Sequence, residues 1–163
     1  MTNELCKHCK GPRAKYECGI CKECTCKKCT QFIEEDFIYL SNIPENLSHP
    51  QYCPTCFDEH VANDLLDYQN TVEEAKDVSV FKKDQSKVTR LLNRKADPLK
   101  VTDCEDEKTA LIKMSYQAVK LGYNALIDVE FKNKKIINGS HKKIIVDAHA
   151  IPTTVDKNKK FYD

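Results

Sequence analysis

The sequence has no excess of charge of one sign, no long hydrophobic run and few glycines. Its 163 residues contain 26 Lys and Arg against 25 Asp and Glu, and this net charge of +1 excludes nucleic-acid binding through global charge alone. No stretch approaches the roughly 18 to 20 apolar residues that a membrane-spanning helix needs. The N-terminus has no basic start followed by an apolar run, so no signal peptide is expected. A soluble, cytoplasmic, Lys-rich protein is therefore predicted.

Cysteine is the residue in excess. Nine of the ten cysteines lie between Cys6 and Cys56, and the tenth, Cys104, is alone. Without a secretory signal, such a cluster favours metal binding over disulfide bonding, in a reducing, cytosol-like compartment.

Eight of these cysteines form four Cys-x-x-Cys pairs, separated by 8, 4 and 23 residues. Two thiolates three residues apart on a tight turn can bind one tetrahedral ion, so four pairs predict two four-sulfur zinc sites. Such closed sites are structural, because no position remains for water or substrate. The first pair is Cys6 and Cys9, the second Cys18 and Cys21, the third Cys26 and Cys29, and the fourth Cys53 and Cys56.

Two connectivities fit these pairs. Serial sites would combine the first pair with the second and the third with the fourth. An interleaved, or cross-brace, arrangement would combine the first with the third and the second with the fourth. The gap of only four residues between Cys21 and Cys26 favours interleaving, since neighbouring short turns can then face different ions. Cys24, inside that gap, is predicted to be a loop cysteine outside both sites.

The cysteine spacing over residues 4–68 resembles that of the FYVE-type double-zinc finger. That family also separates its second and third pairs by four residues, and it closes with Cys-x-x-Cys, an aromatic residue and a helix, as Cys53, Cys56 and Phe57 do here. The resemblance implies a cross-brace finger and, as an alternative function, a phosphoinositide-binding membrane adaptor. The sequence from Lys15 to Ile20 replaces the basic motif that binds the lipid phosphate in that family. A RING-like ubiquitin-transfer scaffold is the other cross-brace alternative.

The second half predicts an α+β domain. A helix is expected over residues 103–121, with a capping box at Thr102 and Glu105 and a stop at Gly122. Strands are expected on both sides of it, and Asn138-Gly139 indicates a tight turn between the last two. The order β-β-α-β-β implies an antiparallel sheet covered by one helix. The predicted strands are residues 78–81, 88–92, 125–131 and 144–151.

A helix that ends in Leu-Gly, followed by Asn-Ala and an apolar strand, occurs at Leu121 to Phe131. This stretch resembles the bacterial YbjQ-type domain, a family linked to heavy-metal binding, over residues 76–152. The resemblance implies that the second half could form a homo-oligomer. Cys104 and His149 are its only soft metal-ligand candidates.

The charges of the two halves are opposite. Residues 1–68 hold 7 Lys and Arg against 11 Asp and Glu, whereas residues 69–163 hold 19 against 14. We therefore predict a finger over 1–68, a linker over 69–76, an α+β domain over 77–155 and a polar tail over 156–163.

Lysines gather around the predicted turn from Lys132 to Lys143, where an anionic membrane, a nucleic acid or an acidic partner could bind. No Ser/His/Asp set, paired-carboxylate motif or phosphate loop stands out, so no enzymatic activity is predicted. The prediction is a non-enzymatic zinc-binding module for a protein partner.

Overall fold

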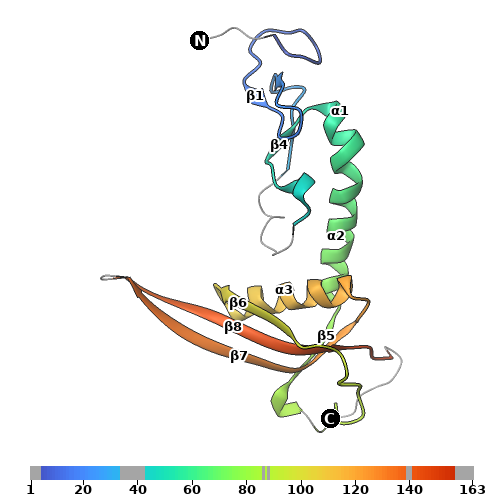
Figure 1. Ribbon diagram of the computed structural model, residues 1–163, viewed down its shortest axis with the longest axis vertical. Coiled ribbons are helices and arrows are strands. Elements are labelled where there is room, and N and C mark those ends of the chain that lie inside the picture. The colour runs from blue at the N-terminus through green and yellow to red at the C-terminus, as the bar shows by residue number, and fades with distance from the viewer. Residues whose placement is uncertain (1–4, 34–42, 86, 88, 139–140, 157–163) are drawn as a thin grey trace. The chain divides into compact units, whose positions relative to one another are not determined.

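The computed structural model describes residues 5–33, 43–85, 87, 89–138 and 141–156 (Figure 1). The chain divides into two compact units, Met1–Asn70 and Thr71–Asp163. Residues 69–76, which the sequence assigned to a linker, are the last part of helix α2 (Ala62–Lys76). Residues 157–163 of the predicted tail lie outside the described residues. Among the residues described, no helix combines the length and the apolar character needed to cross a bilayer.

The first unit is built from very short elements. Strand β1 (Tyr16–Glu17) pairs antiparallel with β2 (Cys24–Thr25), and β3 (Gln31–Phe32) pairs antiparallel with β4 (Gln51–Tyr52). A 3₁₀ turn spans Glu45–Leu47. Helix α1 (Pro54–Cys56), a π-helical turn (Phe57–Val61) and α2 then follow one another without a break. Two-residue ladders offer few hydrogen bonds, so most of the stability of this unit must come from other contacts.

The buried interior of the first unit is centred on Tyr52, which has no exposed surface. Its hydroxyl donates to the carbonyl oxygen of Asn46 at 2.6 Å and accepts from the backbone N–H of His49 at 3.0 Å. Burial raises the pKa of Tyr52, which keeps the hydroxyl a donor. Val61 and Tyr68, in the helical segment that follows Cys56, are also buried. Tyr52 therefore ties the turn before β4 to the core.

The second unit is a four-stranded sheet in the order β5-β7-β8-β6. Its elements follow the chain order predicted, β-β-α-β-β. The expectation of a purely antiparallel sheet is wrong for its first strand, because β5 pairs parallel with β7. A parallel neighbour is possible here because the chain between β5 and β7 passes through β6 and the helix, a connection long enough for a crossover. The elements are β5 (Ser79–Lys82), β6 (Leu99–Cys104), α3 (Glu107–Lys120), β7 (Ala125–Asn138) and β8 (His141–Thr153).

The predicted strand over 88–92 is wrong. Residues 89–92 form turns, and the side chain of Leu91 is 94% exposed. The Arg94 guanidinium holds this turn, donating to the carbonyl and hydroxyl oxygens of Thr89 at 2.9 and 3.0 Å and to Asp128 at 2.9 Å. The second strand is instead β6, whose last three residues the sequence analysis had assigned to the cap and first turn of the helix.

Helix α3 begins later than predicted. Its N-cap is Asp106, whose carboxylate accepts from the backbone N–H of Thr109 at 2.6 Å, and not Thr102, which lies in β6. The helix lies along one face of the sheet (Figure 1). Ala110, Met114 and Ala118 have no exposed surface, because residues four apart share the face that packs on the strands. The core that they join also contains Val78, Val101, Cys104, Leu126, Val129, Val146, Ala148 and Ala150.

The predicted stop of α3 at Gly122 is a left-handed C-terminal cap. Gly122 has φ +82°, its N–H donates to Val119 O at 2.9 Å, and the N–H of Tyr123 donates to Ala118 O at 2.9 Å. This pair of bonds is the Schellman motif, which needs a positive φ at the residue after the helix.

We expect Gly122→Ala to lower the free energy of unfolding of the second unit by about 1–2 kcal/mol, the cost of a left-handed conformation for a residue with a Cβ. An added Cβ would meet no atom within 4 Å, so the loss comes from the backbone alone. Urea unfolding measures the change. Gly122→Asn is the matched control, because Asn tolerates this conformation, and an equal loss in both variants would contradict the explanation.

Candidate metal centre

The four cysteine pairs meet in two groups of four. Within each group the sulfur atoms all lie within 4.8 Å of one another. Cys9 Sγ is 3.7 Å from Cys26 Sγ, and Cys21 Sγ is 3.8 Å from Cys53 Sγ. A tetrahedral ion with Zn–S bonds of about 2.3 Å separates its sulfurs by about 3.8 Å. The first group is Cys6, Cys9, Cys26 and Cys29, and the second is Cys18, Cys21, Cys53 and Cys56.

None of the ten cysteines forms a disulfide. A disulfide would place two sulfurs about 2.0 Å apart, far closer than the spacing in either group. Each group can therefore hold one metal ion, as predicted from the pair spacing, and the thiolate set suits zinc. The first group combines the first and third pairs, and the second combines the second and fourth.

The first two pairs lie on turns of the same design. The N–H of Cys6 donates to Gly11 O at 2.8 Å, and the N–H of Lys10 donates back to Cys6 O at 2.8 Å. The turn at Cys18 has the same two bonds. The N–H of Cys18 donates to Glu23 O, and the N–H of Lys22 donates to Cys18 O, both at 3.0 Å. Lys10 and Lys22 have φ of 57° and 61°, a left-handed conformation that closes each turn. The turn directs both sulfurs of a pair to one side.

The third pair is supported by two buried threonines. The Thr30 hydroxyl donates to Cys26 O at 2.9 Å and lies 2.8 Å from the Thr25 hydroxyl. The Thr25 hydroxyl also donates to Tyr16 O at 3.2 Å. This chain of bonds connects strand β2 to the turn that carries Cys26 and Cys29.

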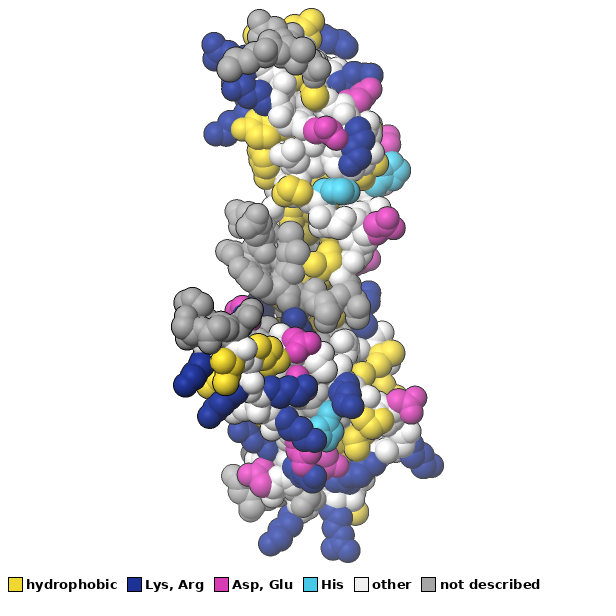
Figure 2. All heavy atoms as spheres, turned by 60° about the vertical axis from the view of Figure 1, so that its left-hand side comes forward, with side chains coloured by type: hydrophobic (Ala, Val, Ile, Leu, Met, Phe, Trp, Pro, Cys, Tyr) yellow, Lys and Arg dark blue, Asp and Glu magenta, His cyan; other side chains and the backbone are white. Residues whose placement is uncertain are grey.

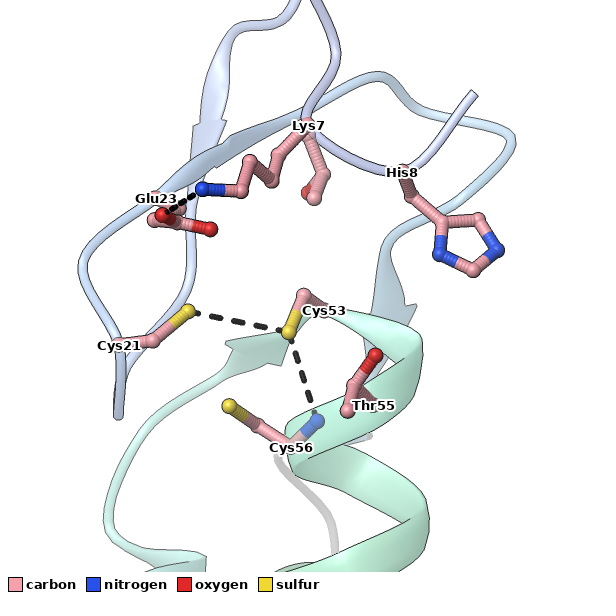
Figure 3. A pocket seen from close by; sticks show the side chains of 8 residues that line it. Lys7, His8, Cys21, Glu23, Cys53, Thr55 and Cys56 are labelled. Carbon is pink, nitrogen blue, oxygen red and sulfur yellow. Dashed lines mark hydrogen bonds and ion pairs between the residues drawn. The ribbon is translucent and has the colours of Figure 1, made fainter. Parts of the chain in front are cut away.

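The fourth pair lies at the start of the helix. Cys53 is the N-cap of α1, Pro54 follows at the first helical position, and Cys53 Sγ accepts from the N–H of Cys56 at 3.4 Å. Figure 3 shows the sulfurs of Cys21, Cys53 and Cys56 directed toward one another. Burial raises the pKa of Cys53 and outweighs the hydrogen bond from the N–H of Cys56, which favours the thiolate.

Backbone amides lower the pKa of Cys6 and Cys26 in the first group and of Cys18 in the second. The amide of Cys9 is the main cause that lowers the pKa of Cys6 to about 6. Burial raises the pKa of Cys18, but amides, chiefly that of Cys53, outweigh it and lower the pKa to about 7. Hydrogen bonds to the charged form produce these shifts. The thiolate forms of Cys6 and Cys18 are therefore favoured relative to an ordinary cysteine.

In each group another thiol has a raised pKa instead. Burial, followed by the neighbouring thiol of Cys9, raises the pKa of Cys29 to about 12. Burial, followed by Cys53, likewise raises the pKa of Cys56. Four thiolates so close together repel one another, so a cation is needed before all four can ionise. This balance is the electrostatic argument for a divalent metal in each group.

The second group depends on a close backbone approach. Gly19 lies between Cys18 and Cys21, and its N–H donates to Gln51 O at 3.0 Å. A Cβ at Gly19 would lie 2.4 Å from both Cβ and Cγ of His49. No larger residue fits unless the backbone moves, because His49 Cβ is fixed to its own main chain.

We expect Gly19→Ala to destabilise the first unit by about 1–3 kcal/mol, the usual cost of overpacking, and to weaken zinc retention in a chelator competition. The double variant Gly19→Ala/His49→Gly removes the clashing side chain and should recover most of the retention. His49→Gly alone provides the baseline for this comparison. A double variant as weak as Gly19→Ala would rule out the clash as the cause.

The remaining metal-ligand candidates lie outside both groups. Cys24 is half-buried in β2, and Cys104 is buried in the core of the second unit, where burial raises its pKa. His149 Nε2 lies 3.1 Å from a carboxylate oxygen of Glu130 instead of near Cys104 in a metal group. In the described part of the chain, no third group of this kind is present.

His149 borders a hollow of about 580 Å³ in the second unit. Two cations line it, but Lys83 pairs with Glu130 and Arg94 pairs with Asp128. Since both cations are already neutralised, this hollow presents no obvious ligand chemistry.

The chain matches no protein-family model, no curated protein and no solved structure. The FYVE and YbjQ resemblances stay predictions.

Proposed function

We propose that residues 1–68 form a cross-brace, FYVE-like finger with two structural zinc ions, acting as a non-enzymatic module that binds a protein partner. The observation that carries this proposal is the interleaved grouping of the cysteines. One ion would join the first and third cysteine pairs, which lie on either side of the second pair. The other ion would join the second and fourth pairs, which lie on either side of the third. Both ions are then needed to hold one surface together.

The donor set favours a structural role. Four thiolates complete a tetrahedral shell, so neither ion would have a position for water or substrate. The two ions would instead replace the large core that this unit lacks, since segments of about 65 residues are marginally stable without such help. The function then depends on the surface that the ions support.

A hollow of about 340 Å³ beside the second group is a candidate part of this surface. Figure 3 shows Lys7 and Glu23 on one side of it and Thr55 of the helix on the other. Lys7 pairs with Glu23, and both remain largely exposed. Cys21, Cys53 and Cys56 of the second group line the hollow together with these polar residues, and such a mixed surface suits an extended segment of a partner protein.

Native mass spectrometry tests the metal proposal directly, and two zinc ions per chain are expected. Immobilised protein then tests the interaction: a partner should be retained by the zinc-loaded chain and by Cys24→Ser, and lost after chelation. Liposome flotation with phosphatidylinositol 3-phosphate and a ubiquitin-discharge assay test the two alternatives. Zinc-free protein, or discharge of ubiquitin that requires Cys18, would overturn the proposal.

A further inference from the structure

Strands β7 and β8 continue far beyond the rest of the sheet. They pair with each other as far as Asn138 and His141, whereas β6 leaves β8 at Val146 and β5 leaves β7 at Val129. Residues 134–138 and 141–145 therefore form a two-stranded ribbon, which we name the arm, and no further strand among the described residues pairs with it. Ile145, at its base, is only 6% exposed. Figure 1 shows the arm extending past the sheet.

The arm exposes isoleucines that stand opposite lysines. Ile136, Ile137 and Ile144 are 46%, 66% and 55% exposed. Residues directly opposite in an antiparallel pair share a face, and successive residues alternate faces. Both faces of the arm therefore carry isoleucine beside lysine, and Figure 2 shows hydrophobic and Lys side chains together on this part of the molecule. The three pairs are Ile136 with Lys143, Ile137 with Lys142, and Ile144 with Lys135.

The charge of the arm has one sign. Residues 131–146 contain no Asp or Glu. Lys134 pairs with Asp147, and Lys143 makes an exposed pair with Glu105 at 3.4 Å. Lys135 and Lys142 form no ion pair with any carboxylate in the described ranges. The arm therefore offers unneutralised positive charge next to exposed aliphatic surface.

We propose that the arm binds an anionic lipid surface, a role separate from that of the zinc module. The lysines would contact lipid phosphates, and the isoleucines would enter the boundary between headgroups and acyl chains. Aliphatic burial and attraction to anionic headgroups are the two contributions that hold an amphipathic element at a membrane. Long lysine side chains can keep their charge at the surface while the ribbon between them is partly immersed.

The same side chains fit other partners less well. Single-stranded nucleic acid is usually bound with several aromatic residues that stack on bases, and the arm contains no Phe, Tyr or Trp. Isoleucine gains nothing from contact with a phosphate backbone. A second copy of the arm would bring lysines against lysines, which is how proteins protect strand edges from pairing.

The test uses the full zinc-loaded chain in vesicle co-sedimentation. Vesicles of phosphatidylcholine alone are compared with vesicles of equal parts phosphatidylcholine and phosphatidylserine at low and physiological salt. One variant is Lys135→Gln/Lys142→Gln and another is Ile137→Thr/Ile144→Thr, which keeps β-branched residues in the strands. Lys108→Gln/Lys120→Gln removes the same charge from exposed positions of α3 and serves as the control.

We expect binding only to the anionic vesicles. Each lysine removed from the arm should weaken it about fivefold, the effect of one basic residue near an anionic surface. The isoleucine variant should also bind more weakly, and the α3 control should bind like the unchanged protein. Thermal unfolding confirms that each variant is folded, since the arm lies outside the core.

Three outcomes would overturn the proposal. The first is no binding to anionic vesicles at low salt, and the second is equal binding by the arm variants and the control. The third is that only the lysine variant binds the anionic vesicles more weakly, and that it loses binding to a DNA oligonucleotide to the same extent. That third result would assign the arm to a general polyanion surface instead of a lipid surface.

Discussion

Replacing Cys53 by Ser is expected to release one of the two proposed zinc ions and to unfold the first unit. Serine is a good N-cap, so α1 keeps a capping side chain and the change isolates the loss of a metal ligand. Structural zinc contributes on the order of 10–16 kcal/mol in zinc-finger peptides, as much as the whole stability of many domains. Cys18→Ser, in the same group, should behave alike.

Native mass spectrometry counts the ions in this experiment, and hydrogen exchange resolved by peptide reports each unit separately. Cys24→Ser is the matched control, since Cys24 lies between the second and third pairs but belongs to neither group. It should retain two ions and protected amides. Protection should be lost in the first unit of Cys53→Ser and largely kept in the second. Two retained ions in both ligand variants would refute the assignment of the second group.

Replacing Leu126 by Ala is expected to have the largest effect on the second unit. Leu126 has no exposed surface and belongs to the core beneath α3, on the central strand β7. Removing a buried Leu side chain leaves a cavity that costs about 2–5 kcal/mol. Hydrogen exchange in the second unit should rise accordingly, while native mass spectrometry should still find two zinc ions.

Leu91→Ala is the control for this prediction, because its side chain is almost fully exposed. Exposed leucines contribute little, so its effect should stay within about 0.5 kcal/mol. If Leu126→Ala released zinc, the two units would not be energetically separate. That result would contradict the division of the chain at Asn70.

The cysteine groups could be predicted because metal ligands are a property of spacing. Cysteine pairs three residues apart can be recognised directly in the sequence. The short gap after Cys21 favoured joining the first pair with the third and the second with the fourth, and the sulfur atoms are grouped in this way. Helix α3 and the β7–β8 hairpin were found for a similar reason, since Met114, Ala118 and the alternating residues of β7 follow regular periods. The turn itself, at Gly139, lies outside the described residues.

The features that the sequence concealed depend on contacts between distant residues. No local sequence pattern predicts the close approach of Gly19 to His49. The left-handed backbone at Lys10 and Lys22 was also hidden, because a glycine would have indicated it and lysine does not. The parallel pairing of β5 was missed because strand direction depends on the path of the intervening chain. Strand β6 could have been predicted from the sequence, because Leu99 and Val101 alternate with polar residues.

The interleaving of the cysteines also bears on how the protein is made. As synthesis proceeds from the N-terminus, the first group has all its sulfurs once Cys29 has emerged, whereas the second must wait for Cys53 and Cys56. During that interval Cys18 and Cys21 would have only each other from the second group. A nascent chain would thus acquire its ions in a fixed sequence, and the growing helix after Cys56 would arrive together with the last ligands.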